Sequence, residues 1–156
     1  MNNNEGRKIQ SRVYKDLPLL ELTMRKMEKP SNNYDEVLRK FCISVGLLQP
    51  GDSRDIIVSI LKILLKARKY KKLVPTEVMN KLLKEKKGGT PPNIRRQLRR
   101  LKELGFIEKK TKGYRLREFM PLNELLSTHF EPFILKPTYE RIKLYGKKLD
   151  ELSEKN

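Results

Sequence analysis

The segment Ile56–Leu65 is the feature that most limits how this chain can fold. Its sequence, IIVSILKILL, places apolar side chains around more than half of a helix's circumference. A helix this apolar must pack on two or more sides, so a helix from Ser53, its N-cap, to about Tyr70 is predicted at the centre of the fold. The segment includes Lys62 and is far shorter than the roughly 20 residues of a membrane span. With no signal peptide visible, the sequence predicts a cytoplasmic protein.

Apolar periodicity and turn residues predict further helices on both sides of this central one. Before it, we expect an amphipathic helix from Asp16 to Pro30, with Leu17, Leu20, Met24 and Met27 on one face, and a helix from Tyr34 to Val45. After it come a short strand in KKLV, a helix from Pro75 to about Lys84 and a helix from Thr90 to Leu104. In the Pro75 helix, the predicted inward residues are Val78, Met79, Leu82 and Leu83.

The segments FIEKK and YRLR around TKG then predict a β-hairpin with glycine in its turn. The rest is predicted as a short helix from Pro121 to about Ser127, an irregular THFEPFILK, and a last helix from Pro137 to about Leu152. The fold class is therefore mainly α with a small β element.

The positive charge is concentrated in the middle of the chain. The net charge is +17 over 156 residues, and residues 51–117 carry 21 Lys and Arg against 6 Asp and Glu, a balance of +15. Residues 1–50 contribute +3 and residues 118–156 contribute −1. Such a local excess predicts a polyanionic partner, because like charges in one segment repel each other until an anion neutralises them.

Four arginines fall within the single predicted helix that starts at Thr90. At 100° per residue, Ile94, Leu98, Leu101 and Gly105 share one face, which we expect to be buried. Asn93, Arg96, Arg99 and Arg100 fall on the opposite face, and Arg95 lies on a flank with Lys102. Arginine suits phosphate or guanine, and asparagine suits adenine, so this face is a candidate DNA-reading surface. The alternative is an ordinary solvated basic face.

The phrases VPTEVMNKL, NIRRQLRRLKELGFIEKK and KGYRLRE resemble a winged helix-turn-helix domain of prokaryotic transcription regulators. The resemblance is to the MarR-like and archaeal TrmB-like groups and covers about residues 53–117. It implies a recognition helix at 90–104 in the major groove and a wing at 106–117 on the DNA backbone. The DNA contacts that it implies are Thr90, Asn93, Arg95, Arg96, Arg99 and Arg100 on the helix, and Lys109, Lys110, Lys112 and Arg115 in the wing.

The chain then divides into a flexible tail (1–15), an N-terminal helical segment (16–50), the DNA-binding domain (51–117) and a C-terminal helical extension (118–156). The favoured function is sequence-specific regulation of transcription on double-stranded DNA. An alternative is an interaction module of the basal transcription or replication machinery that holds nucleic acid without reading its sequence. RNA binding is less favoured, because the chain shows no aromatic-rich platform for unpaired bases.

The C-terminal helix carries Ile142, Tyr145, Leu149 and Leu152 at the spacing of a coiled-coil seam. This stripe can pack within the chain on the Leu17–Met27 helix or pair with a second chain, and we favour a homodimer. One cysteine, Cys42, and one histidine, His129, are too few for a structural zinc site. Cys42 is predicted to be a buried thiol and His129 a pairing or surface residue. We expect no enzyme activity, no metal and no cofactor, and the sequence identifies no site for a small-molecule effector.

Overall fold

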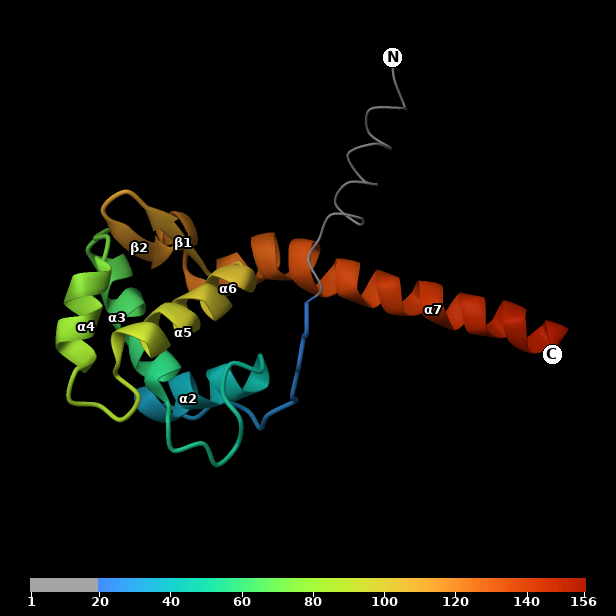
Figure 1. Ribbon diagram of the computed structural model, residues 1–156, viewed down its shortest axis with the longest axis horizontal. Coiled ribbons are helices and arrows are strands. Elements are labelled where there is room, and N and C mark those ends of the chain that lie inside the picture. The colour runs from blue at the N-terminus through green and yellow to red at the C-terminus, as the bar shows by residue number, and fades with distance from the viewer. Residues whose placement is uncertain (1–19) are drawn as a thin grey trace, which may run out of the picture.

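The computed structural model describes residues 20–156. This part of the chain is mainly helical and contains one small antiparallel sheet, which confirms the predicted fold class (Figure 1). The predicted tail (1–15) and Leu17 lie outside the described residues. The elements are α2 (Tyr34–Ser44), α3 (Ile56–Lys69), α4 (Thr76–Leu83), α5 (Pro91–Glu103), β1 (Ile107–Lys110), β2 (Gly113–Leu116), η1 (Arg117–Phe119), α6 (Leu122–Leu125), η2 (Leu126–Leu135) and α7 (Lys136–Lys155).

Helix α3 is central, as its apolar surface predicted. It contacts α2, α4, α5 and β2, and Ile56, Ile57, Ile60, Leu61 and Leu64 are buried on it. The helix begins at Ile56 with Asp55 as N-cap, so the predicted start at Ser53 was wrong. Arg39 explains the later start, because it holds the preceding segment outside the helix. Its guanidinium bonds the Asp55 carboxylate at 3.1 Å and the Asp52 carbonyl at 2.7 Å.

Residues 20–33 precede α2 as an irregular segment, so the helix predicted up to Pro30 is wrong over its described part. Leu20 and Leu22 both pack against the core. Side chains two residues apart face the same side in an extended chain but not in a helix. The Arg25 N–H donates to the carbonyl of Ser44 at 2.9 Å, which ties the segment to the end of α2. Met24, predicted on the buried face, is 55% exposed.

Helix α4 buries a narrower face than its sequence predicted. Met79 and Leu83, one turn apart, are buried, whereas Val78 and Leu82 are exposed, which corrects their predicted inward positions. The eight-residue helix packs mainly on α3 and α5, so a single stripe of its surface is covered.

The predicted hairpin is present, and β1 and β2 pair Ile107 with Leu116 and Lys110 with Gly113, which places Gly113 at the start of β2 rather than in the turn. The strand predicted in KKLV is only an isolated bridge in the structure. In it, Val74 and Tyr114 exchange two backbone hydrogen bonds, of 2.8 and 2.9 Å. Gly113 is required there, since a Cβ on it would lie 2.6 Å from the Val74 backbone.

After the hairpin, α6, η2 and α7 form one continuous helix, so the irregular segment predicted at THFEPFILK is wrong. Residues Leu126–Leu135 adopt the wider π-helical turn. Pro132 has no N–H to donate, and the hydroxyls of Ser127 and Thr128 bond carbonyls one turn back. The wider turns accommodate the proline without ending the helix. Helix α7 then projects from the body as an arm (Figure 1), and every residue from Arg141 to Asn156 is exposed.

Phe106 joins the arm to the body. Its side chain is fully buried between Phe41 of α2, at 5.9 Å between ring centroids, and Phe130 of η2, at 5.4 Å. In the part of the chain that the structure covers, no helix combines the length and apolarity of a membrane span.

Candidate nucleic-acid interface

Helix α5 presents Arg95, Arg96 and Arg99 to solvent. Ile94, Leu98 and Leu101 bury the opposite face against the core, which fixes these three arginines outward. Within residues 20–156, no carboxylate lies close enough to any of the three to form an ion pair. The guanidinium groups are therefore available to an external anion.

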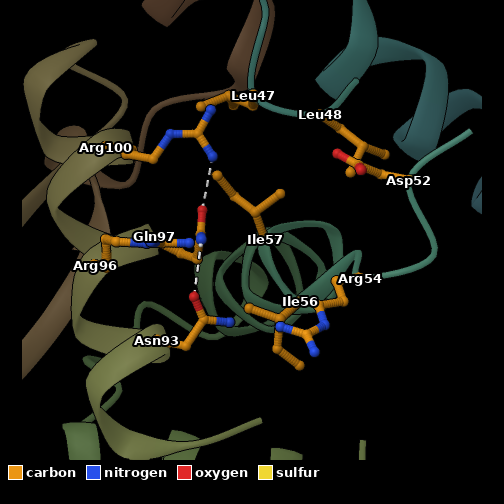
Figure 2. A pocket seen from close by; sticks show the side chains of 10 residues that line it. All are labelled: Leu47, Leu48, Asp52, Arg54, Ile56, Ile57, Asn93, Arg96, Gln97 and Arg100. Atoms are coloured by element: carbon orange, nitrogen blue, oxygen red, sulfur yellow. Dashed lines mark hydrogen bonds between the residues drawn. The ribbon is translucent and has the colours of Figure 1, made fainter. Parts of the chain in front are cut away.

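Asn93 and Arg100 do not share this free surface, although the sequence placed them on the same face. The amide of Asn93 donates to the Gly88 carbonyl at 2.7 Å and accepts from Gln97 at 3.1 Å. Gln97 accepts from Arg100 at 2.8 Å, and Arg100 donates to the Gly46 carbonyl at 3.1 Å. Figure 2 shows Asn93, Gln97 and Arg100 as a ladder along one side of α5.

The ladder lies on a polar wall of an open pocket of about 230 Å³. Leu47 and Leu48, in the loop after α2, and Ile56 and Ile57 of α3 also line this pocket (Figure 2). The buried part of the α5 surface is thus wider than the apolar stripe of the helix. It includes the polar residue Gln97, which is only 7% exposed. Sequence analysis missed Gln97. The spacing of Asn93 and Gln97, one helical turn apart, is the signal that could have identified the pair.

The N-terminal end of α5 is exposed and rigid. Thr90 is the N-cap residue, as predicted, but its side chain makes no capping hydrogen bond. Pro91 and Pro92 have no backbone N–H groups, so fewer donors remain in the first turn for the Thr90 hydroxyl to accept from. Thr90 therefore stays open to solvent beside the exposed arginines.

The hairpin places Lys109, Lys110 and Lys112 in solvent near its turn. Lys109 lies over the Tyr114 ring at 6.0 Å, and Lys110 lies 3.6 Å from the Glu108 carboxylate. Lys112, in the turn itself, has no hydrogen-bond or ion-pair partner among the described residues. Strand β1 follows α5 directly and contacts it, so the hairpin begins beside the C-terminal end of the helix.

Arg115, the remaining residue of the predicted site, is held within the hairpin. Its Nε donates to Glu108 at 2.9 Å, and its guanidinium stacks over the Phe119 ring at 4.8 Å from the centroid. Glu108 also accepts the Glu118 N–H at 2.8 Å. Glu118 and Phe119 both have positive φ, at 52° and 55°, so the carboxylate holds a strained turn between the hairpin and α6. Sequence analysis missed Glu108.

Ionisation of Glu108 is favoured by these contacts. Burial opposes the charged form, but the Glu118 N–H and the Arg115 guanidinium together outweigh it, so the pKa of Glu108 lies below its ordinary value. A lowered pKa means that the carboxylate stabilises the fold above its unfolded pKa of about 4.3. That stabilisation is lost as the pH falls through the folded pKa.

We expect Glu108→Gln to lower the free energy of unfolding by about 1–2 kcal/mol at pH 7, because the charge-assisted bonds to Arg115 and Glu118 weaken. The difference from the parent should shrink as the pH falls through the lowered pKa of Glu108, where the parent carboxyl becomes protonated. Urea unfolding at a series of pH values from 7 downward measures both effects. Glu103→Gln, on an exposed residue of α5, is the control, and an equal loss in both variants would contradict the role of Glu108.

The predicted seam residues Ile142, Tyr145, Leu149 and Leu152 are all exposed on α7, at 45–69% of their surface. They do not pack on residues Leu20–Met27. For the described residues, the alternative that this stripe packs within the chain is therefore excluded.

Cys42 is fully buried, as expected, and burial raises its pKa to about 12. His129 lies 2.9 Å from the Thr128 hydroxyl, a local pairing as predicted. Residues 20–156 contain no group of three or more metal-ligating side chains.

No family model, curated protein or solved structure matches this chain. The surface formed by α5 and the hairpin, through its geometry and charge, is therefore the guide to the function of this chain.

Proposed function

We propose that this protein is a DNA-binding transcription regulator of the winged helix-turn-helix kind. Helix α5 enters the major groove, and the hairpin, as the wing, lies on the DNA backbone. The observation that carries the proposal is the set of three exposed arginines on α5, Arg95, Arg96 and Arg99, which have no anionic partner among the described residues. A folded helix that leaves three guanidinium groups unpaired on one surface is well suited to a polyanion.

The order of elements supports this proposal. A central helix α3, the bridge at Val74, the pair α4 and α5, and the hairpin follow one another as in winged helix-turn-helix domains. The balance of +15 over residues 51–117 falls on these elements. It supplies the attraction to phosphates that dominates the affinity of proteins for DNA.

The arginines and the lysines have different roles in the proposed complex. Arginine presents two parallel N–H groups that match O6 and N7 of guanine, so Arg96 and Arg99 are the proposed base-reading residues. Lys109 and Lys112 at the hairpin contact phosphates, which set the position of the protein without reading sequence. Asn93 holds the turn at Gly88 to α5, and Arg100 holds the loop at Gly46 to it. Both contacts position the face of the helix that carries the base-reading arginines.

A second candidate is a winged-helix module that holds DNA without reading its sequence. The engagement of Asn93 within the protein favours it, because the free face then contains arginines, which bind phosphate as well as guanine. The two functions differ in the ratio of specific to non-specific affinity.

Selection of bound duplexes from a random pool, at a stated salt concentration, tests the proposal. We expect an enriched site that binds at least about 10³-fold more tightly than random duplex. Uniform recovery of all sequences would favour the non-specific module, and no binding to duplex would overturn both.

We expect Lys112→Ala to weaken binding to all duplexes alike and to reduce the slope of log K against log salt by about one, because one phosphate contact is lost. Binding titrations between 50 and 200 mM salt, a range that resolves such slopes, measure this effect. Lys147→Ala removes the same charge from the arm and is the control. An unchanged slope for Lys112→Ala would place the hairpin turn off the DNA.

A further inference from the structure

Helix α7 carries an apolar face that nothing in the described part of the chain covers. Ile142 is 61% exposed, Tyr145 69%, Leu149 62% and Leu152 45%. Burial of such side chains is strongly favourable, and a row of four along one helix is unusual on a free surface. The spacing of three and four residues is that of positions a and d in a heptad. A seam with this period matches another helix of the same period better than it matches a flat surface.

The heptad register runs from Leu135 to Lys155 when Ile142 and Leu149 occupy position a and Tyr145 and Leu152 occupy position d. In the first heptad Leu135 packs on the core of the body and Thr138, at position d, bonds the Ile134 carbonyl. The exposed apolar seam therefore begins at Ile142 and spans two heptads.

The charges that flank the seam determine the direction of pairing. On one flank, position g is cationic in all three heptads: Arg141, Lys148 and Lys155. On the other flank, position e is uncharged throughout: Tyr139, Gly146 and Ser153. In a parallel pair each g residue faces an e residue of the partner, whereas in an antiparallel pair g faces g. Antiparallel pairing would therefore set three cations against three cations.

Gly146 is a second, independent feature of this surface. Glycine inside a helix lowers its stability, yet a Cβ at Gly146 would meet nothing within 4 Å in this chain. The fold of the single chain therefore gives no reason for glycine at this position. In a parallel pair, position e of this heptad lies opposite the long side chain at position g of the partner's preceding heptad, and glycine gives that side chain room.

We propose that the face formed by Ile142, Tyr145, Leu149 and Leu152 binds the same face of a second copy of this chain, in a parallel two-stranded coiled coil. The pairing goes beyond the proposed DNA binding and does not depend on it. Parallel pairing places both bodies at the same end of the arms, because each body joins its arm at the N-terminal end of α7 (Figure 1). If the proposed function holds, the dimer presents two copies of α5 to one duplex, related by a two-fold axis.

Light scattering and analytical ultracentrifugation on the full-length protein without DNA test the pairing. We expect the parent protein to be a dimer at micromolar concentration and Leu149→Asp to weaken dimerisation at least tenfold, since it places a charge in the seam. Leu144→Asp is the matched control, because Leu144 is a leucine of similar exposure (59% against 62% for Leu149) on the far side of the same helix. It should leave the dimer intact. Leu152→Asp gives the same test if Leu149→Asp does not fold.

A monomeric parent would overturn the proposal. Equal effects of Leu149→Asp and Leu144→Asp would also overturn it, because they would place the contact outside the seam. Neither result bears on whether the body binds DNA, so failure here is distinguishable from failure of the proposed function.

Disulfide formation by Asn156→Cys tests the direction. Asn156 occupies position a at the end of the arm, so parallel pairing brings the two new thiols together. Antiparallel pairing separates them by roughly 30 Å, since α7 has 20 residues and a helix rises about 1.5 Å per residue. Cys42 is buried and does not interfere, and the parent protein is the control. We expect a covalent dimer on a non-reducing gel after mild oxidation. A dimeric protein that forms no covalent dimer would overturn the parallel direction.

Discussion

A variant that combines Arg96→Ala and Arg99→Ala is expected to lose most of its preference for the selected duplex. Each arginine that pairs with a guanine contributes about 1–3 kcal/mol, which is about 5- to 150-fold in Kd. Both side chains are exposed on α5 and have no ionic partner in residues 20–156, so their removal should leave the fold unchanged. Binding to random duplex should fall much less, because most phosphate contacts remain. Titrations on both duplexes, with thermal unfolding as the check on folding, measure these effects.

Two controls sharpen this test. Lys143→Ala combined with Lys147→Ala removes the same two charges from the arm and should leave the specificity ratio unchanged. Arg100→Ala should act mainly on stability, because Arg100 bonds Gln97 and the Gly46 carbonyl. If the double arginine variant binds the selected duplex as tightly as the parent, α5 is not the reading element.

Phe106→Ala is expected to lower the free energy of unfolding by about 3–5 kcal/mol. The phenyl ring is fully buried and lies between Phe41 and Phe130, so its removal leaves a cavity where α2, the hairpin and the C-terminal helix meet. Small domains are stable by only about 5–15 kcal/mol, so the loss is a large share of the total. Urea unfolding followed by circular dichroism measures it.

Phe133→Ala is the control, because Phe133 is a phenylalanine of η2, the helix that carries Phe130, and is 55% exposed. It should change stability by less than about 1 kcal/mol. Similar losses in the two variants would mean that Phe106 does not join the arm to the body as described.

Periodicity and turn residues were sufficient to predict most of the body. Helices α2, α3, α4 and α5 and the hairpin each have a repeating apolar pattern or a glycine where the chain must turn, and these signals are local. The prediction failed at Leu20–Met27, where residues three and four apart are apolar but the segment packs in an extended form. It failed again at Val78 and Leu82, because a pattern shows which face is apolar but not how much of it the neighbours cover.

The candidate site was predicted by residue type rather than by contact. Four arginines and an asparagine marked α5, and the exposed set reduces to Arg95, Arg96 and Arg99. Asn93 and Arg100 form hydrogen bonds within the protein instead. One of the partners, the Gly46 carbonyl that Arg100 bonds, lies far away in the sequence, and no local pattern reveals such a contact. Pro132 led to the wrong prediction of an irregular segment. A π-helical turn accommodates this residue, although proline usually ends a helix.

The bridge between Val74 and Tyr114 has a consequence for how the protein folds. It closes a long loop that contains both α4 and α5, whereas each helix and the hairpin form from contacts nearby in the chain. Closing a loop of this length costs entropy before the two hydrogen bonds compensate for it, so the bridge forms only after α4 and α5 have docked on α3. The base of the hairpin is held to the body separately, because Ile107 and Leu116 are fully buried and β2 packs on α3. Opening the bridge is therefore expected to free only the end of the hairpin near Lys112, while its base and the helix that carries the arginines stay in place.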